Sequence, residues 1–138
     1  MALILDTGPV VALLDAGDSA HHACLAMVES TNEPLVIPVA TLVEINYWVT
    51  KLHGMAVWTT FAEDIAEGAY RLEPLTIADL SRAAELETQY ESLRLGFVDA
   101  SVIALCERLG EPKVATLDKR DFSVVRPRHC DSLRLLPD

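Results

Sequence analysis

The stretch that decides the fold is Leu3-Ile4-Leu5-Asp6-Thr7-Gly8-Pro9. Three consecutive apolar residues are too few for a helix and are typical of a short buried strand. An acid follows directly, and a proline two positions after Thr7 favours the start of a helix. The stretch therefore predicts a strand that ends at a carboxylate, followed at once by a helix.

The same alternation continues along the chain. Short apolar or β-prone runs predict strands at residues 3–5, 35–37, 70–72 and 114–116. Apolar residues spaced three and four apart predict helices at residues 9–15, 20–30, 39–53, 55–67, 76–93 and 98–109. Thr76 and Asp79 fit a capping box, and Gly110 fits a helix stop. Strands that alternate with helices predict an α/β fold with a mainly parallel sheet covered on both faces.

Composition limits the class of protein. The chain has 138 residues, 51% hydrophobic and 23% charged, without an internal repeat or a Gly/Ser linker, so we expect a single domain over residues 1–138. Its longest apolar stretch is far below the roughly 18 residues of a membrane span, and we expect no membrane association. The N-terminal residues lack the basic region of a signal peptide, and the three unpaired cysteines suit a reducing compartment, which predicts a cytoplasmic protein.

Charge is distributed unevenly. Residues 1–107 contain sixteen Asp/Glu and four Lys/Arg, whereas residues 108–138 contain five and seven. Because phosphate binding depends on Lys and Arg, a polyanion has to meet the basic tail or a bound cation. The tail residues considered for RNA contact are Lys119, Arg120, Arg126 and Arg128, and the alternative is a solvated tail.

Carboxylates follow the predicted strands. Asp6 and Asp118 close two of them, Glu44 lies one to two turns into the helix after a third, and Asp99 lies in the first turn of a later helix. Each has a structural alternative as a cap, a turn former or a favourable partner of a helix dipole. For Glu44, an aromatic neighbourhood suggests partial burial and Lys51 is the candidate partner.

Ligands of parallel α/β folds bind at the carboxyl ends of the strands, where these acids are expected to meet. Clustered carboxylates repel one another unless a cation neutralises them. An oxygen-only set favours Mg²⁺, with Mn²⁺ possible, over Zn²⁺. Such ions activate water for attack on a phosphodiester, so the pattern predicts a metal-dependent phosphodiesterase.

Four motifs together resemble the PIN domain, and more narrowly the VapC-type toxins of bacterial toxin-antitoxin pairs. They are Leu3 to Pro9, Glu44 in a central helix, Phe97-Val98-Asp99-Ala100-Ser101, and the run from Ala115 to Phe122. The resemblance covers residues 3 to about 126 and implies a three-layer α/β/α fold. It also implies a Mg²⁺-dependent endoribonuclease that a cognate antitoxin inhibits, and a homodimer is common among similar toxins.

The resemblance also assigns roles to residues. It makes Asp6 and Asp99 the principal metal ligands, completed by Glu44 and Asp118. It gives supporting hydroxyls to Thr7 and Thr116 and leaves Asp121, ranked below Asp118, as a second candidate for the fourth acid. Gly8 departs from the pattern, because many relatives have serine there.

Other interpretations stay open. Residues 39–67 are rich in aromatics and offer either an apolar groove for an antitoxin helix or a second subunit, or ordinary core packing; the residues concerned are Tyr47, Trp48, Val57, Trp58 and Phe61. The alternatives for function are a PIN-like RNA-processing nuclease outside a toxin-antitoxin pair, a phosphotransfer domain, and a non-enzymatic interaction module.

Overall fold

The strands of the chain form one parallel sheet. The computed structural model describes residues 1–138 and contains β1 (Leu3–Ile4), β2 (Leu35–Pro38), β3 (Arg71–Glu73), β4 (Lys113–Ala115) and β5 (Arg134–Leu136). Parallel pairing links β1 with β2, β2 with β3, and β4 with β5. A parallel bridge from Leu5 to Ala115 and the hydrogen bond from Asp6 N to Ala115 O (2.9 Å) join β1 to β4. The strand order is therefore β3-β2-β1-β4-β5.

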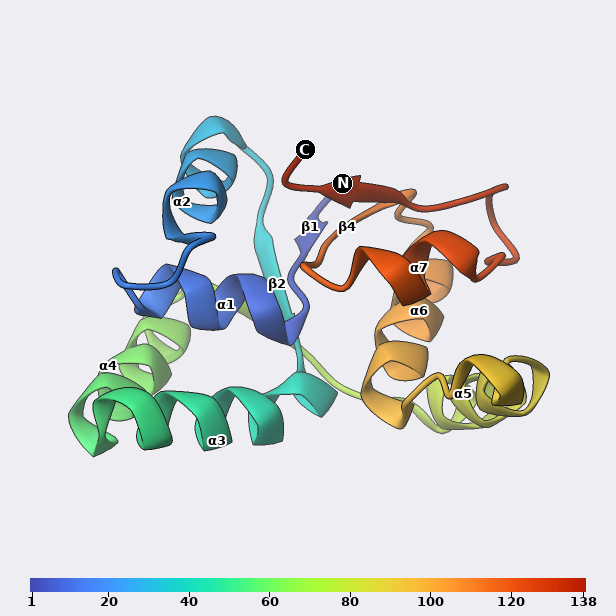
Figure 1. Cartoon of the computed structure of the whole chain (residues 1–138), viewed down its shortest axis with the longest axis horizontal. Helices are drawn as coiled ribbons and strands as arrows, with labels where there is room; N and C mark the ends of the chain where they lie inside the picture. Colours follow the sequence, from blue (N-terminus) through green and yellow to red (C-terminus); the bar gives the residue numbers. More distant parts are fainter.

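Helices cover both faces of this sheet. The α-helices are α1 (Thr7–Leu14), α2 (His21–Ser30), α3 (Leu42–His53), α4 (Met55–Ala66), α5 (Ile77–Gln89), α6 (Phe97–Leu109) and α7 (Lys119–Val124), and the 3₁₀ turns are η1 (Val39–Thr41) and η2 (Glu91–Leu93). Figure 1 shows α1 to α4 on the left of the strands and α5 to α7 on the right. The three-layer α/β/α arrangement with a parallel sheet is confirmed. None of the seven α-helices is long and apolar enough to cross a membrane.

Alternation along the strands divides the interior into two cores. Leu3 and Leu5 pack in the core beneath α1 to α4, whereas Ile4 between them packs in the core beneath α5 to α7. Successive side chains of a strand point to opposite faces, so each buried strand contributes to both cores. This is why short, continuously apolar runs identified the strands: both faces are covered.

The structure confirms two predicted helix ends, the start of α5 and the end of α6. Thr76 and Asp79 form a reciprocal capping box at the start of α5, with bonds of 3.0 and 3.1 Å. Gly110 ends α6 in the left-handed conformation (φ 66°), which glycine adopts without a steric penalty.

Two other predictions differ from the structure. The helix predicted over residues 76–93 is wrong in its last turns, because α5 ends at Gln89 and the chain turns through η2 to Arg94 in the left-handed region (φ 58°). The second difference is that β5 and α7 were not predicted, since each is too short to show a periodic pattern.

Candidate active site

Five carboxylates approach one another beside the carboxyl ends of β1 and β4. Asp6 follows β1, Glu44 lies in the first turn of α3, Asp99 in the first turn of α6, Asp118 at the N-cap of α7 and Asp121 in its first turn. Glu44 is thus nearer the start of its helix than the sequence suggested, because residues 39–41 form the separate turn η1. The four predicted acids meet at one edge of the sheet, together with the lower-ranked Asp121.

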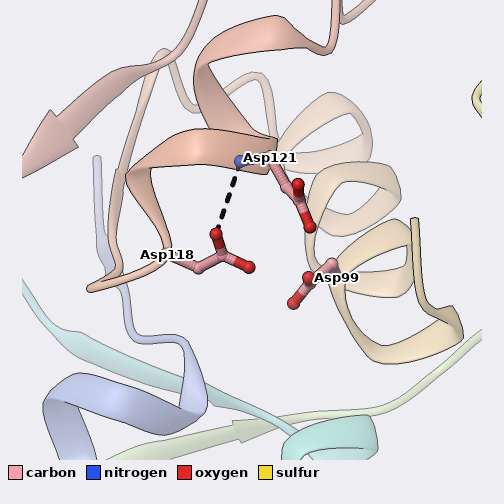
Figure 2. Close-up of side chains that lie close together, drawn as sticks. All are labelled: Asp99, Asp118 and Asp121. Carbon is pink, nitrogen blue, oxygen red and sulfur yellow. Dashed lines mark hydrogen bonds between the residues drawn. The ribbon is translucent and has the colours of Figure 1, made fainter. Parts of the chain in front are cut away.

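Three of these side chains form a tight group. One carboxylate oxygen from each of Asp99, Asp118 and Asp121 lies within 4.8 Å of the other two. Figure 2 shows Asp99 reaching from α6 toward the start of α7, where Asp118 and Asp121 stand. Asp118 also accepts a hydrogen bond from Asp121 N at 3.3 Å, so it caps α7 rather than forming a simple turn, and it does so while lying in the cluster.

Threonine hydroxyls orient the other two acids. Thr116 Oγ1 donates to Asp6 Oδ2 at 2.8 Å and accepts from Asp118 N at 3.0 Å, so one hydroxyl connects two members of the cluster. Thr7 Oγ1 donates to Glu44 Oε1 at 2.8 Å. Thr7 and Thr116 thus each hydrogen-bond to one acid of the cluster.

Asp6 is not a side-chain cap. It occupies the N-cap position of α1, but its carboxylate makes no capping hydrogen bond and is instead 5% exposed beside Thr116. A buried carboxylate with a raised pKa beside other acids is a common feature of functional sites.

Burial and mutual repulsion raise the pKa of three carboxyls of the cluster. Burial, followed by the charges of its four acidic neighbours, raises the pKa of Asp99 to about 7. The pKa of Asp6 is raised chiefly by burial, and the hydrogen bond from Thr116 works in the opposite direction. The pKa of Asp121 is also raised, by desolvation and by the neighbouring charge of Asp118. A site that strains its own carboxylates in this way favours a cation.

The donor set fits a hard divalent cation. The group that comes within ligand distance contains only aspartates, with no histidine or cysteine. Carboxylate oxygens are the ligands that Mg²⁺, Mn²⁺ and Ca²⁺ prefer, whereas Zn²⁺ sites use nitrogen and sulfur. The acidic cluster is therefore a candidate divalent metal centre.

The partner expected for Glu44 is wrong. Glu44 is exposed rather than partly buried, and its hydrogen bond goes to Thr7. Lys51 turns instead toward the rings of Tyr47 and Trp48. The two charges are seven residues apart on α3, which is about two turns, and contacts along a helix favour residues three or four apart.

The four basic residues considered for RNA contact do not form one group. Arg120 is close enough to Asp121 to counter the rise in its pKa, and Lys119 Nζ donates to Pro137 O. Arg126 bonds to Asp131 O in its own loop at 3.2 Å. Arg128 pairs with Glu85 at 2.8 Å and bonds through its N–H to Glu107, which lies eight residues beyond Asp99 along α6.

The aromatic segment is divided between the core and the surface. Phe61 is fully buried, with its ring centroid 5.3 Å from that of Tyr70, and Trp58 is half-buried against the same core. Val57 packs there as well. Tyr47 and Trp48, in contrast, are 54% and 44% exposed on α3. Core packing therefore accounts for the aromatic residues of α4, whereas Tyr47 and Trp48 on α3 lie at the surface.

Comparison with known proteins agrees with the geometry. A parallel sheet between two helical layers, with an acidic cluster at the strand ends, places the chain among the α/β domains that carry a cation site there. Residues 3–126 match the PIN domain, and the chain belongs to the PIN domain family. It is 30% identical over 125 residues, 91% of this chain and 93% of that protein, to Ribonuclease VapC26 of Mycobacterium tuberculosis (strain ATCC 25618 / H37Rv).

Solved structures share the fold at low sequence identity. The sarcin-ricin loop cleaving toxin VapC20 of Mycobacterium tuberculosis superposes with a TM-score of 0.79 at 20% identity, covering 86% of this chain and 92% of that one. VapBC2 of Rickettsia felis, bound to a DNA fragment from its promoter, gives 0.70 at 16% identity, covering 99% and 98%. DNA-bound VapBC of Salmonella typhimurium gives 0.71 at 14% identity, covering 99% and 97%.

Proposed function

We propose that the protein is a divalent-metal-dependent endoribonuclease and the toxin of a toxin-antitoxin pair. Membership of the PIN domain family and 30% identity to a protein named as a VapC ribonuclease support this function. The observation that carries it is the meeting of three aspartate oxygens within 4.8 Å, beside the buried and hydroxyl-bonded Asp6. A non-enzymatic interaction module has no use for carboxylates held in mutual repulsion.

The metal ligands in this proposal are Asp6, Asp99, Glu44 and Asp118, with Asp121 close enough to join them. Mg²⁺ is the proposed ion and Mn²⁺ its substitute. When bound, the cation supplies positive charge to the phosphodiester and activates a water for in-line attack.

The chain's own residues prepare this site. Thr116 holds the Asp6 carboxylate and the backbone of Asp118 in one arrangement through a single hydroxyl. The backbone N–H of Asp121 fixes the Asp118 side chain. Asp99, whose pKa is raised to about 7, would hold the cation in its deprotonated form, so cation binding would be weaker below neutral pH. Carboxylates that are already held in place lose less conformational entropy when a cation binds.

The proposed partners follow from the same family. Single RNA strands are the substrate, a cognate antitoxin is the inhibitor, and a second copy of the chain forms a homodimer in the cytoplasm. The similar folds of VapBC2 and VapBC, both solved in complex with DNA, support an antitoxin partner.

The proposal is tested by metal titration and RNA cleavage on the same samples. The wild-type chain should bind Mg²⁺ or Mn²⁺ calorimetrically and cut RNA, and Asp6→Asn and Asp99→Asn should do neither. Glu63→Gln is the matched control, since Glu63 is an exposed acid on α4 with no side-chain bond. Expression in a bacterium without an antitoxin should arrest growth for the wild type alone.

The alternatives predict other results. Cation binding without any RNA cleavage would refute the nuclease. Absence of both, with a folded protein, would favour the interaction module. RNA cleavage without growth arrest would favour an RNA-processing nuclease outside a toxin-antitoxin pair.

A further inference from the structure

One face of α3 combines two exposed aromatic rings with a lysine. Tyr47, Trp48 and Lys51 follow Glu44 at spacings of three, four and seven residues, which places all four on one side of the helix. We refer to Tyr47, Trp48 and Lys51 as the aromatic platform. Tyr47 and Trp48 are 54% and 44% exposed, well above what core residues show.

The platform has a definite geometry. The two rings meet edge to face, with centroids 5.1 Å apart and planes at 86°. Lys51 Nζ lies 5.4 Å from the centroid of Tyr47 and 5.5 Å from that of Trp48, and bonds to Tyr47 Oη at 3.4 Å. These cation–π contacts hold the ammonium group beside the rings.

Lys51 has no acidic partner. Most basic side chains of the protein pair with carboxylates, as Arg82 does with Glu107 and Lys113 with Glu33. None of the ion pairs includes Lys51, although the chain carries a net charge of -10. Its positive charge is therefore free to meet an anion from outside.

The platform is continuous with the acidic cluster. Glu44, at the start of α3, bonds to Thr7 beside the cluster, and Lys51 lies about 10 Å further along the helix axis by the usual rise per residue. Glu44 is also the only acid on α3. A chain whose phosphate is at the cluster can extend along α3 without crossing another carboxylate of that helix.

We propose that Tyr47, Trp48 and Lys51 bind the single-stranded RNA that flanks the cleaved phosphodiester. A nucleobase stacks on the exposed rings, and Lys51 contacts a neighbouring phosphate. Stacking on aromatic side chains with a nearby cation is the common physical basis of single-strand binding. The inference rests on the proposed function, because it uses the acidic cluster as the place where the RNA is cut.

A protein partner is the competing occupant. The exposed aliphatic side chains of Val43 and Leu52 border the platform on the helix surface. The centre of the face, however, carries rings and a free cation rather than aliphatic side chains, and it leads to the cluster. These features favour RNA.

Binding is measured apart from cleavage. In a Trp58→Phe variant, Trp48 is the only tryptophan, and the ring packing against Phe61 is largely retained. This protein is titrated with a single-stranded oligoribonucleotide of about 12 nucleotides in the presence of Ca²⁺, which takes the same oxygen ligands. The intactness of the RNA is checked on a gel. We expect quenching of Trp48 by the single strand and much less by a duplex.

Substitutions then assign the contacts. For the variants, affinity is read from the fluorescence anisotropy of the end-labelled oligoribonucleotide, which needs no tryptophan in the protein. Trp48→Ala should weaken binding at least about 5-fold, the lower end of the loss of one stacked base. Lys51→Gln should reduce the slope of log affinity against log salt by about 0.7. Ile77→Ala, which truncates an apolar side chain that is 86% exposed on α5 across the sheet, should change neither.

Other results overturn the inference. Wild-type affinity in both Trp48→Ala and Lys51→Gln excludes RNA from the platform. A Trp48→Ala variant that no longer self-associates in sedimentation but keeps its RNA affinity also excludes RNA, because the face then binds a protein. Failure of the proposed function is a different result, namely RNA binding that is normal with no cleavage in Mg²⁺ or Mn²⁺.

Discussion

Replacing Asp99 by asparagine should stabilise the metal-free protein at pH 8. Burial, followed by repulsion from four other carboxylates, raises the pKa of Asp99 from an ordinary value of 3.8 to about 7. Asparagine is nearly isosteric and uncharged, so it removes both the cost of burying a charge and the repulsion without leaving a cavity. A substitution that abolishes metal binding should therefore strengthen the fold.

The magnitude follows from the size of the pKa shift. About three pKa units at 1.36 kcal/mol each would give about 4 kcal/mol for a fully buried group. Asp99 is only half-buried, and solvent screens its interactions, which reduces the expected gain to about 1–2 kcal/mol. For a chain of 138 residues this corresponds to an increase in Tm of about 3–7 °C.

The difference in stability between the wild type and Asp99→Asn depends on pH. The folded wild type holds a proton on Asp99 that the unfolded chain has already released above pH 3.8, so its free energy of unfolding falls as pH rises toward about 7. Asp99→Asn does not suffer this loss. The two proteins should be equally stable near pH 4 and should differ fully at pH 8.

Thermal and urea unfolding in chelator, at several pH values from 4 to 8, measure this difference. Adding Mg²⁺ should reverse the order at pH 8, because a ligand at 100 times its Kd stabilises the wild type by about 2.7 kcal/mol. An Asp99→Asn protein that is no more stable than the wild type at pH 8 in chelator would refute the account of repulsion within the cluster.

Three further substitutions test the site and the core. Thr116→Val removes the donor to Asp6 and the acceptor for Asp118 N, and should lower Mg²⁺ affinity about 10-fold by calorimetry; unchanged affinity would contradict the role of this hydroxyl. Asp121→Asn should weaken Mg²⁺ binding, because an oxygen of Asp121 lies within 4.8 Å of oxygens of Asp99 and Asp118; unchanged Mg²⁺ affinity would show that Asp121 is not a metal ligand. Phe61→Ala should cost about 3–5 kcal/mol in urea unfolding, and a loss under 1 kcal/mol would show that its site collapses.

The centre of the fold could be predicted because its signals are local. A buried parallel strand appears as a short apolar run, and Asp6 and Asp118 stand directly after two such runs. The carboxyl ends of parallel strands meet at one edge, so the order of elements was enough to bring distant acids together. The capping box of Thr76 and Asp79 was predictable for the same reason, because it involves only two residues three positions apart.

The remaining features depend on tertiary contacts. The rank of Asp121 below Asp118 could not be judged without knowing that the first turn of α7 faces Asp99. The sequence suggested Lys51 as the partner of Glu44, whereas in the structure Lys51 lies beside the rings of Tyr47 and Trp48. Arg128 was counted with the basic tail, but its charge is paired with Glu85, a residue of another helix.

β5, the last strand of the sheet, supports the acidic cluster although it contributes no carboxylate to it. Leu136 O accepts the backbone N–H of Thr116 at 2.9 Å, so β5 fixes the residue whose hydroxyl orients Asp6. A protease that clipped the chain just before Arg134 would leave every acid of the cluster in the polypeptide. It would nevertheless expose the edge of β4 and remove the hydrogen bond that holds the backbone of Thr116. The site would then be damaged although all of its carboxylates were still present.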